Sequence, residues 1–246
     1  MRTVWRMAFD VARIRGLFPA LGDGWVHLDS PAGMQVPEQV ATAVSTALRA
    51  PVSGPGGTFP ASQRAEAIED AARRAIADLV GAGAAGVVLG PNPAVLLDRL
   101  AEALGERWLI GDEVALSRLD HQANTAPWLR VAQRAGATVR WAEVDIETCE
   151  LPAWQYENLV SHRTRVVAVT AASGAVGTRP DLAKIIAHAK AEGAFVVVDA
   201  SSAAPFVPID IAALGADVVA VSAVAWGGPA VAALAFADPA VLEVGS

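Results

Sequence analysis

Two side chains capable of acid–base chemistry follow apolar runs of strand length. Asp199 ends the run FVVVD over residues 195–199, and His121 comes shortly after the run EVALSRL over residues 113–119. An ionised carboxylate at the end of a buried strand is costly to desolvate unless a cation or hydrogen-bond donors meet it. Asp199 is therefore either a ligand-facing carboxylate or a turn aspartate before SSAAP, and His121 either faces a ligand or belongs to a strand-to-helix loop.

Other reactive residue types are scarce. The chain has two lysines, Lys184 and Lys190, and both fall inside a predicted helix over residues 180–192. The single cysteine, Cys149, lies in a predicted turn, ETCELP, without a histidine nearby, which favours a bystander over a nucleophile. The remaining histidines lack the spacing of metal ligands, so we expect no metal site; they are His27, His162 and His188.

The segment GAGAAG over residues 81–86 matches the dinucleotide-binding fingerprint by letter. That fingerprint needs a strand before it and a helix after it, so that the helix N-terminus meets the pyrophosphate. Here a predicted helix precedes the glycines and the strand GVVLG follows, which indicates a helix-to-strand loop. The chain also lacks a Gly-Lys-Ser/Thr sequence, which excludes nucleotide phosphate transfer through a phosphate-binding loop of that type.

Composition narrows the class of protein. The 246 residues are 53% hydrophobic and 18% charged with a net charge of −7, so the chain can bury a core and has no basic block for nucleic acid. The uncharged residues 218–237 could span a bilayer by length, but WGGP in their middle predicts two buried strands around a turn. A single cysteine fits a reducing environment, so we expect a cytoplasmic protein without membrane contact.

The elements that position these residues alternate between strands and helices. Apolar runs of strand length occur at residues 86–90, 113–119, 138–144, 165–170, 195–199, 217–222 and 230–236. Helical patterns lie between most of them, at residues 92–105, 124–136, 153–160 and 180–192. Continuous apolar strands separated by helices are typical of a mostly parallel sheet with helices on both faces. We therefore predict an α/β fold of about seven strands, closed by an antiparallel hairpin through residues 226–229.

Helical patterns also precede this sheet. A short helix capped by Asp10 comes first, and patterns over residues 37–50 and 61–80 flank the loop SGPGGTFP. We divide the chain into an N-terminal helical segment, residues 1–85, that packs on an α/β large domain, residues 86–246.

The carboxyl ends of the parallel strands form the edge where ligands of open α/β sheets bind. The residues expected at this edge are Asn92-Pro93, Asp120-His121, Ala172-Ser173-Gly174, Asp199 and Ser222. They supply carboxylates, an imidazole, hydroxyls and an amide.

Five residue blocks mark the chain between about residues 18 and 238. They are HLDSPAG at 27–33, DHQANTAPW at 120–128, VD at 198–199, PIDIAALGAD at 208–217, and Ser222 followed by Gly228-Pro229. In order and spacing these blocks resemble the class V aminotransferase family, with the cysteine desulfurase-like branch as the nearest. The resemblance implies a pyridoxal phosphate-dependent transferase large domain, a seven-stranded sheet whose last strand is antiparallel, with the small C-terminal domain missing from this chain.

The resemblance also implies roles for individual residues. His121 would stack on the pyridine ring of pyridoxal phosphate, Asp199 would pair with the protonated ring nitrogen, and Ser222 would donate to the phosphate. Ser202 stands where the family has a glutamine, and Ala94 stands in the family's Gly-Thr-Thr phosphate turn. A carboxylate that keeps the ring nitrogen protonated makes the ring an electron sink.

Other positions depart from the family pattern. The lysine of the family's Ser-Gly-His-Lys block, which forms the bond to the cofactor, is Ala225 here, and the phosphate-binding histidine is Val224. Asn92-Pro93-Ala94 replaces the glycine and two threonines of the phosphate turn. A methyl group can form no Schiff base, so no catalytic set is intact.

These observations predict a cysteine desulfurase-like protein without standard lysine-dependent catalysis, either a pseudoenzyme or a truncated member. Two alternatives stay open: an active pyridoxal phosphate-dependent transferase or lyase with groups supplied by a partner chain, and a protein-interaction scaffold. In the family this domain packs against a small domain and a second subunit, so we expect a homodimer or a partner chain.

Overall fold

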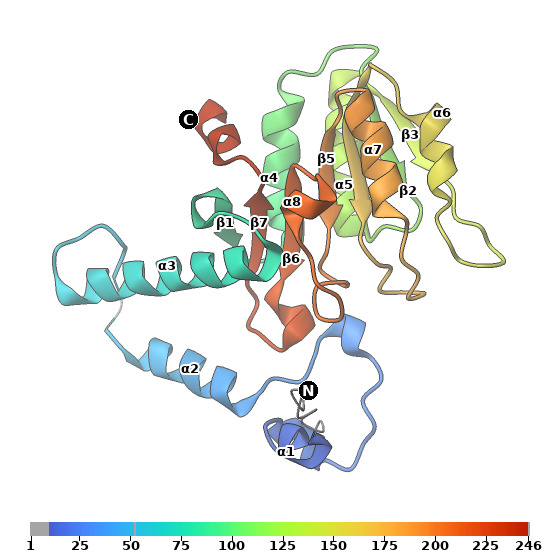
Figure 1. The fold of residues 1–246 in the computed structure, drawn as a ribbon. Helices are drawn as coiled ribbons and strands as arrows, with labels where there is room; N and C mark the ends of the chain where they lie inside the picture. Colours follow the sequence, from blue (N-terminus) through green and yellow to red (C-terminus); the bar gives the residue numbers. More distant parts are fainter. Residues whose placement is uncertain (1–9, 52, 246) are drawn as a thin grey trace, which may run out of the picture.

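A seven-stranded sheet runs through the molecule in the computed structural model, which describes residues 10–51 and 53–245 (Figure 1). The strands are β1 (Val87–Gly90), β2 (Glu113–Ser117), β3 (Thr138–Ala142), β4 (Thr164–Thr170), β5 (Phe195–Asp199), β6 (Val218–Ser222) and β7 (Ala232–Phe236). Their spatial order is β1-β7-β6-β5-β4-β2-β3. β7 is antiparallel to both neighbours, and the other pairings are parallel. The predicted mostly parallel sheet and its closing hairpin are confirmed.

Helices cover both faces of this sheet. One face packs against α4 (Pro93–Gly105) and α5 (Gln122–Ala135), with Leu97 and Trp128 fully buried between the layers. The other face packs against the end of α3 (Pro60–Val80) and against α6 (Tyr156–Leu159), α7 (Leu182–Ala191) and α8 (Ile211–Leu214). Successive residues of the inner strands enter opposite cores, which is why most of their residues are apolar, whereas the edge strand β3 exposes Thr138 and Arg140.

Polar side chains start the helices that follow the strands. Asn92 Oδ1 accepts from the Val95 N–H at 2.9 Å at the start of α4, and His121 Nδ1 accepts from the Ala123 N–H at 3.1 Å at the start of α5. Such caps satisfy backbone donors that the helix itself leaves unpaired. Both capped ends lie where β1 and β2 finish, so each strand delivers a polar residue to the same edge of the sheet.

The glycine-rich segment and the long uncharged segment both fold as expected. Gly81 ends α3 in the left-handed conformation (φ 68°), and a short 3₁₀ turn (Ala84–Gly86) leads into β1, which confirms a helix-to-strand loop. Residues 218–237 contain β6, the 3₁₀ turn η5 (Ala223–Trp226) and β7. Across the described residues, no helix has both the length and the apolar character that a bilayer crossing requires.

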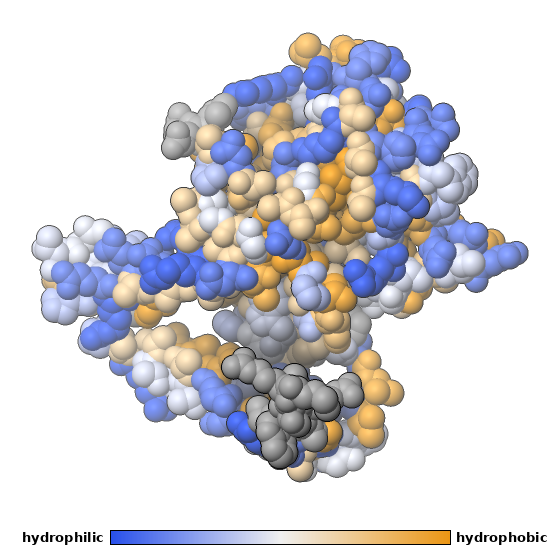
Figure 2. Space-filling model, in the orientation of Figure 1, coloured by the Kyte–Doolittle hydropathy of each residue, from blue (hydrophilic) through white to orange (hydrophobic). Residues whose placement is uncertain are grey.

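The N-terminal helices extend away from the sheet as an arm (Figure 1). α1 (Val11–Arg15) begins as predicted at Asp10, whose carboxylate accepts from the Arg13 N–H at 3.0 Å. α2 (Glu38–Arg49) buries none of its residues, and α3 contacts the sheet through its C-terminal end. Figure 2 shows apolar surface along this arm, where the large exposed side chains include Trp25, Leu28 and Leu48.

The close packing of α4 on α5 makes a test of the fold. A Cβ at Gly105 would lie 2.0 Å from Val131 Cγ1, inside a fully packed core. We expect Gly105→Ala to lower the free energy of unfolding by about 1–3 kcal/mol, measured by urea denaturation, because overpacking forces neighbouring side chains to move.

The matched control is Gly83→Ala. Gly83 has φ −83°, and a Cβ built there meets nothing within 4 Å. Its free energy of unfolding should stay within about 1 kcal/mol of the parent chain. Equal stability of the two variants would contradict the packing described for α4 and α5.

Candidate functional site

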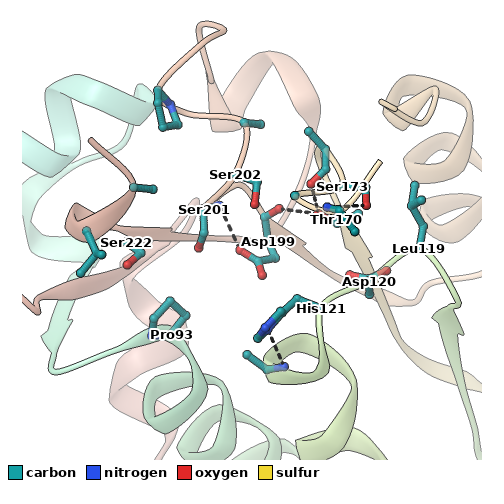
Figure 3. A pocket seen from close by; sticks show the side chains of 18 of the residues that line it. Pro93, Leu119, Asp120, His121, Thr170, Ser173, Asp199, Ser201, Ser202 and Ser222 are labelled. Carbon is teal, nitrogen blue, oxygen red and sulfur yellow. Dashed lines mark hydrogen bonds between the residues drawn. The ribbon is translucent and has the colours of Figure 1, made fainter. Parts of the chain in front are cut away.

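A cavity of about 950 Å³ lies at the carboxyl edge of the parallel strands. All the residues that the sequence placed at this edge line it, including Asn92 after β1 and Ser173 after β4. The five positions singled out as a cofactor site also line it, and Figure 3 labels most of them; they are Ala94, His121, Asp199, Ser202 and Ser222. Their gathering in one cavity agrees with the predicted strand directions, whereas their cofactor-binding role stays a prediction.

Asp199 carries the most strongly desolvated carboxylate of the cavity wall. The residue is 6% exposed, and its Oδ1 accepts from the Ser201 N–H at 3.0 Å. Burial raises the pKa of Asp199, while Ser201 and the imidazole of His121 partly oppose that rise. In Figure 3 the carboxylate points into the space between Ser201 and His121. Asp199 is therefore both the turn aspartate and the cavity-facing carboxylate between which the sequence could not decide.

His121 likewise combines its two expected roles. Its Nδ1 accepts the Ala123 N–H that begins α5, which leaves the proton of the neutral imidazole on Nε2. The side chain is exposed to the cavity and lies near Asp199 (Figure 3). The ring can offer a flat surface and an N–H donor to a ligand while its other nitrogen is held by the helix.

Asp120, directly before His121, forms a second acidic centre at this edge. Its carboxylate accepts from Ser117 Oγ and from Asn124 Nδ2, the latter at 2.7 Å. Desolvation raises the pKa of Asp120 to about 7, although these two hydrogen bonds lower it. The negative charge of Asp199 adds to the rise. Nearby, the hydroxyl of Tyr156 is buried without a hydrogen-bond partner among the described residues, and desolvation raises its pKa as well.

The start of α4 closes one end of the cavity to anions. Pro93 has no N–H, the Val95 N–H donates to Asn92 Oδ1, and the Leu96 N–H donates to the Asn92 carbonyl oxygen at 3.4 Å. Within this first turn, the Ala94 N–H is left to face a ligand. A helix N-terminus binds anions through several free N–H groups, and here Pro93 and the Asn92 side chain reduce their number.

The amines and the thiol lie away from this cavity. Lys184 pairs with Asp181 at 3.0 Å and Lys190 pairs with Asp217, both from α7, and neither lysine lines the cavity. Cys149 sits in a tight turn with φ 57°, as its position in the sequence predicted, and lines no part of the cavity. Within the described residues, His, Cys, Asp and Glu side chains form no group of three that could hold a metal ion.

The sequence matches the family described as Aminotransferase class-V over residues 26–238. The chain belongs to this family. It is 56% identical over 237 residues to the uncharacterized Mycobacterium tuberculosis protein MT3887, covering 96% of this chain and 60% of that protein. It is also 31% identical over 251 residues to a cysteine desulfurase of Yersinia pseudotuberculosis, again covering 96% and 60%.

Solved structures agree with this class V assignment. The cysteine desulfurase CsdA from Escherichia coli superposes with a TM-score of 0.83 at 31% identity, covering 93% of this chain and 58% of that one. The fold is that of the pyridoxal phosphate-dependent transferases. The chain spans about 60% of the length of the curated relatives it matches.

Pyridoxal phosphate, the cofactor that membership of the class V family suggests, fits this cavity only at its ring end. Asp199 and His121 present a buried carboxylate and an imidazole that suit a pyridine ring. The opposite wall has the capped start of α4 and, on η5, Val224 and Ala225, whose side chains carry no donor. The residues present therefore do not fit the phosphorylated cofactor held through its phosphate and a lysine.

Two residues of the cavity, Ser201 and Arg179, were not among those that the sequence placed at the ligand edge. Asp120 was placed at this edge without a role, although an acidic side chain directly after a buried strand and beside His121 indicates one. Ser201 looked like part of a turn, yet its Oγ is buried beside Asp199 without a hydrogen-bond partner among the described residues. Arg179 reaches the cavity through the loop before α7, whose path no periodicity predicts.

The raised pKa of Asp120 predicts how stability depends on pH. The folded chain keeps this proton until about pH 7, whereas the unfolded chain releases it near the ordinary value of 3.8. The folded state therefore binds more protons in this window, and the free energy of unfolding falls as pH rises, by at most about 4 kcal/mol. Asp120→Asn removes this titration, so the stability of the variant relative to the parent should increase between pH 4 and pH 8.

Urea denaturation of both chains at pH 4, 6 and 8 measures this effect. Asp120 and Asp199 interact through their charges, so the difference reports the titration of Asp120 together with its coupling to Asp199. A difference that stays constant across the three pH values would contradict the raised pKa of Asp120.

Proposed function

We propose that this class V aminotransferase family member is a cysteine desulfurase-like pseudoenzyme, which binds a small ligand in its cavity without lysine-dependent catalysis. The observation that carries the proposal is Ala225, which lines the cavity just beyond β6 where the family has its lysine. Relatives named cysteine desulfurases, at 31% identity, support descent from that branch.

The chemistry of the site supports the loss of catalysis. A covalent cofactor bond needs an amine inside the cavity, and the chain's two lysines are held in ion pairs on α7. Moving either amine to the cavity would require α7 to leave its place on the sheet, where Ile185 and Ile186 are buried. What the cavity retains are a desolvated carboxylate, an imidazole and hydroxyls, which bind and orient a ligand.

The expectation of assembly with a second chain stays a prediction. The exposed apolar side chains of the arm support it, since Trp25 is 76% exposed and Leu28 is 86% exposed. Soluble proteins rarely leave such surface uncovered unless it meets a partner. A partner could cover this arm whether or not the cavity binds a ligand, so the interaction-scaffold alternative is compatible with the pseudoenzyme proposal.

Covalent labelling tests the proposal directly. The chain is incubated with pyridoxal phosphate, reduced with borohydride and digested, and its peptides are analysed by mass spectrometry. We expect no stoichiometric label on any residue and no release of sulfide from cysteine above the rate with cofactor alone. The double variant Lys184→Arg/Lys190→Arg serves as the control for surface labelling. Stoichiometric label on either lysine together with turnover would overturn the proposal.

Restoring the lysine alone should give attachment without catalysis. Ala225→Lys places an amine in the cavity, so we expect stoichiometric labelling of residue 225 after reduction. The phosphate end still lacks its donors, each of which contributes about 1.5–3 kcal/mol toward a charged group, so a ligand would be attached but poorly oriented. Sulfide release should stay within threefold of the unmodified chain. A tenfold or greater increase would contradict this description of the cavity.

A further inference from the structure

Unsatisfied polar groups gather at one end of the cavity. Asp199 is 94% buried, and the Ser201 N–H donates to its carboxylate through Oδ1 at 3.0 Å. Ser201 Oγ is buried next to it with no hydrogen-bond partner among the described residues. Buried polar groups are normally paired, because an unpaired one costs about 1–3 kcal/mol and a charged one costs more. The groups at this end of the cavity are therefore suited to a ligand group that donates hydrogen bonds and carries positive charge.

The charges that face this end favour a cation. Asp120 and Asp199 lie close enough that the negative charge of Asp199 raises the pKa of Asp120. His121 accepts a helix N–H through Nδ1 and so presents an N–H without a fixed positive charge. Arg179 also lines the cavity, but its side chain is exposed, so water and salt screen it.

The other end disfavours an anion. At the start of α4 the Val95 N–H is bound by Asn92 Oδ1, and Pro93 supplies no N–H. A phosphate placed there would give up its water for the Ala94 N–H, the Ser222 hydroxyl and apolar side chains. Desolvation of a dianion with so few donors is unfavourable.

We propose that the natural occupant of this cavity is a small organic cation without a phosphate group, whose protonated nitrogen binds Asp199 and the Ser201 hydroxyl. The proposal rests on the proposed function, because it concerns the same cavity. It names the chemical class of the ligand, and it separates this chain from a protein that holds a phosphorylated cofactor. The ligand's nitrogen supplies the positive charge and the donors that the buried carboxylate lacks.

Two probes that differ by one phosphate test the proposal. Isothermal titration calorimetry of the full chain with pyridoxamine and with pyridoxamine 5′-phosphate gives two dissociation constants at the same pH and salt. We expect pyridoxamine to bind, and the phosphate to improve the affinity by less than threefold or to weaken it. Binding of pyridoxamine 5′-phosphate at least tenfold more tightly would overturn the proposal, and so would the absence of binding by pyridoxamine at 1 mM.

Charge variants locate the bound cation. Asp199→Asn keeps the shape of the side chain and removes its charge, so the affinity for pyridoxamine should fall at least tenfold. Asp98→Asn removes the same charge from an exposed ion pair between Asp98 on α4 and Arg130 on α5, and it should leave the affinity unchanged. Equal affinities of the two variants would show that Asp199 does not hold the cation. Circular dichroism confirms that both variants are folded.

Rebuilding the phosphate turn tests the role of α4. The triple variant N92G/P93T/A94T frees backbone N–H groups and adds two hydroxyls, so it should shift the preference toward pyridoxamine 5′-phosphate at least tenfold. An unchanged preference would show that the start of α4 does not exclude phosphate. If this variant does not fold, the ratio of the two dissociation constants measured on the parent chain decides whether the proposal holds. Covalent labelling together with turnover would contradict the proposed function, whereas the affinity ratios would contradict this proposal. The two failures are therefore distinguishable.

Discussion

The desolvation of one carboxylate at the end of the central strand organises this molecule's cavity. β5 is the fourth of seven strands, so its last residue, Asp199, lies at the middle of the ligand edge, flanked by β4 and β6. Apolar cores on both faces of the sheet keep water away from it, and the loop after β5 supplies only a limited set of donors. The negative charge of Asp199 therefore constrains the residues beside it. Each of them must either offset that charge or be neutral.

The side chains at residues 199 and 225 have different structural roles in this cavity. Ala225 is compatible with the fold because η5 is a short turn between two strands and needs no charged side chain there. Replacing Asp199 would instead disturb the turn that its Oδ1 holds through the Ser201 N–H. The carboxylate therefore has a structural role that does not depend on an amine at residue 225.

The alternation of strands and helices could be predicted from the sequence because the valine-rich runs are buried on both sides. Strand directions then placed Asp199, His121 and Ser222 at one edge, and the cavity contains all three. The hydrogen bonds of the site could not be predicted in the same way. Whether the Asn92 side chain accepts the Val95 N–H or leaves it free depends on a side-chain rotamer. The pKa of Asp120 depends mainly on how deeply the folded chain buries its carboxylate, and to a smaller extent on the charge of Asp199.

The place of β7 between β1 and β6 has a consequence for how the chain folds during synthesis. β1 is made first among the strands, yet its partner in the sheet is the last strand, through pairs such as Val87 with Ala235. Strands β2 to β6 can associate while the chain is still growing, but β1 and the helices before it must wait at an open edge until β7 emerges. The pairing of β1 with β7 joins residues far apart in the sequence, so we expect it to form slowly. Until it forms, the chain has unpaired strand edges through which it can associate wrongly with other chains.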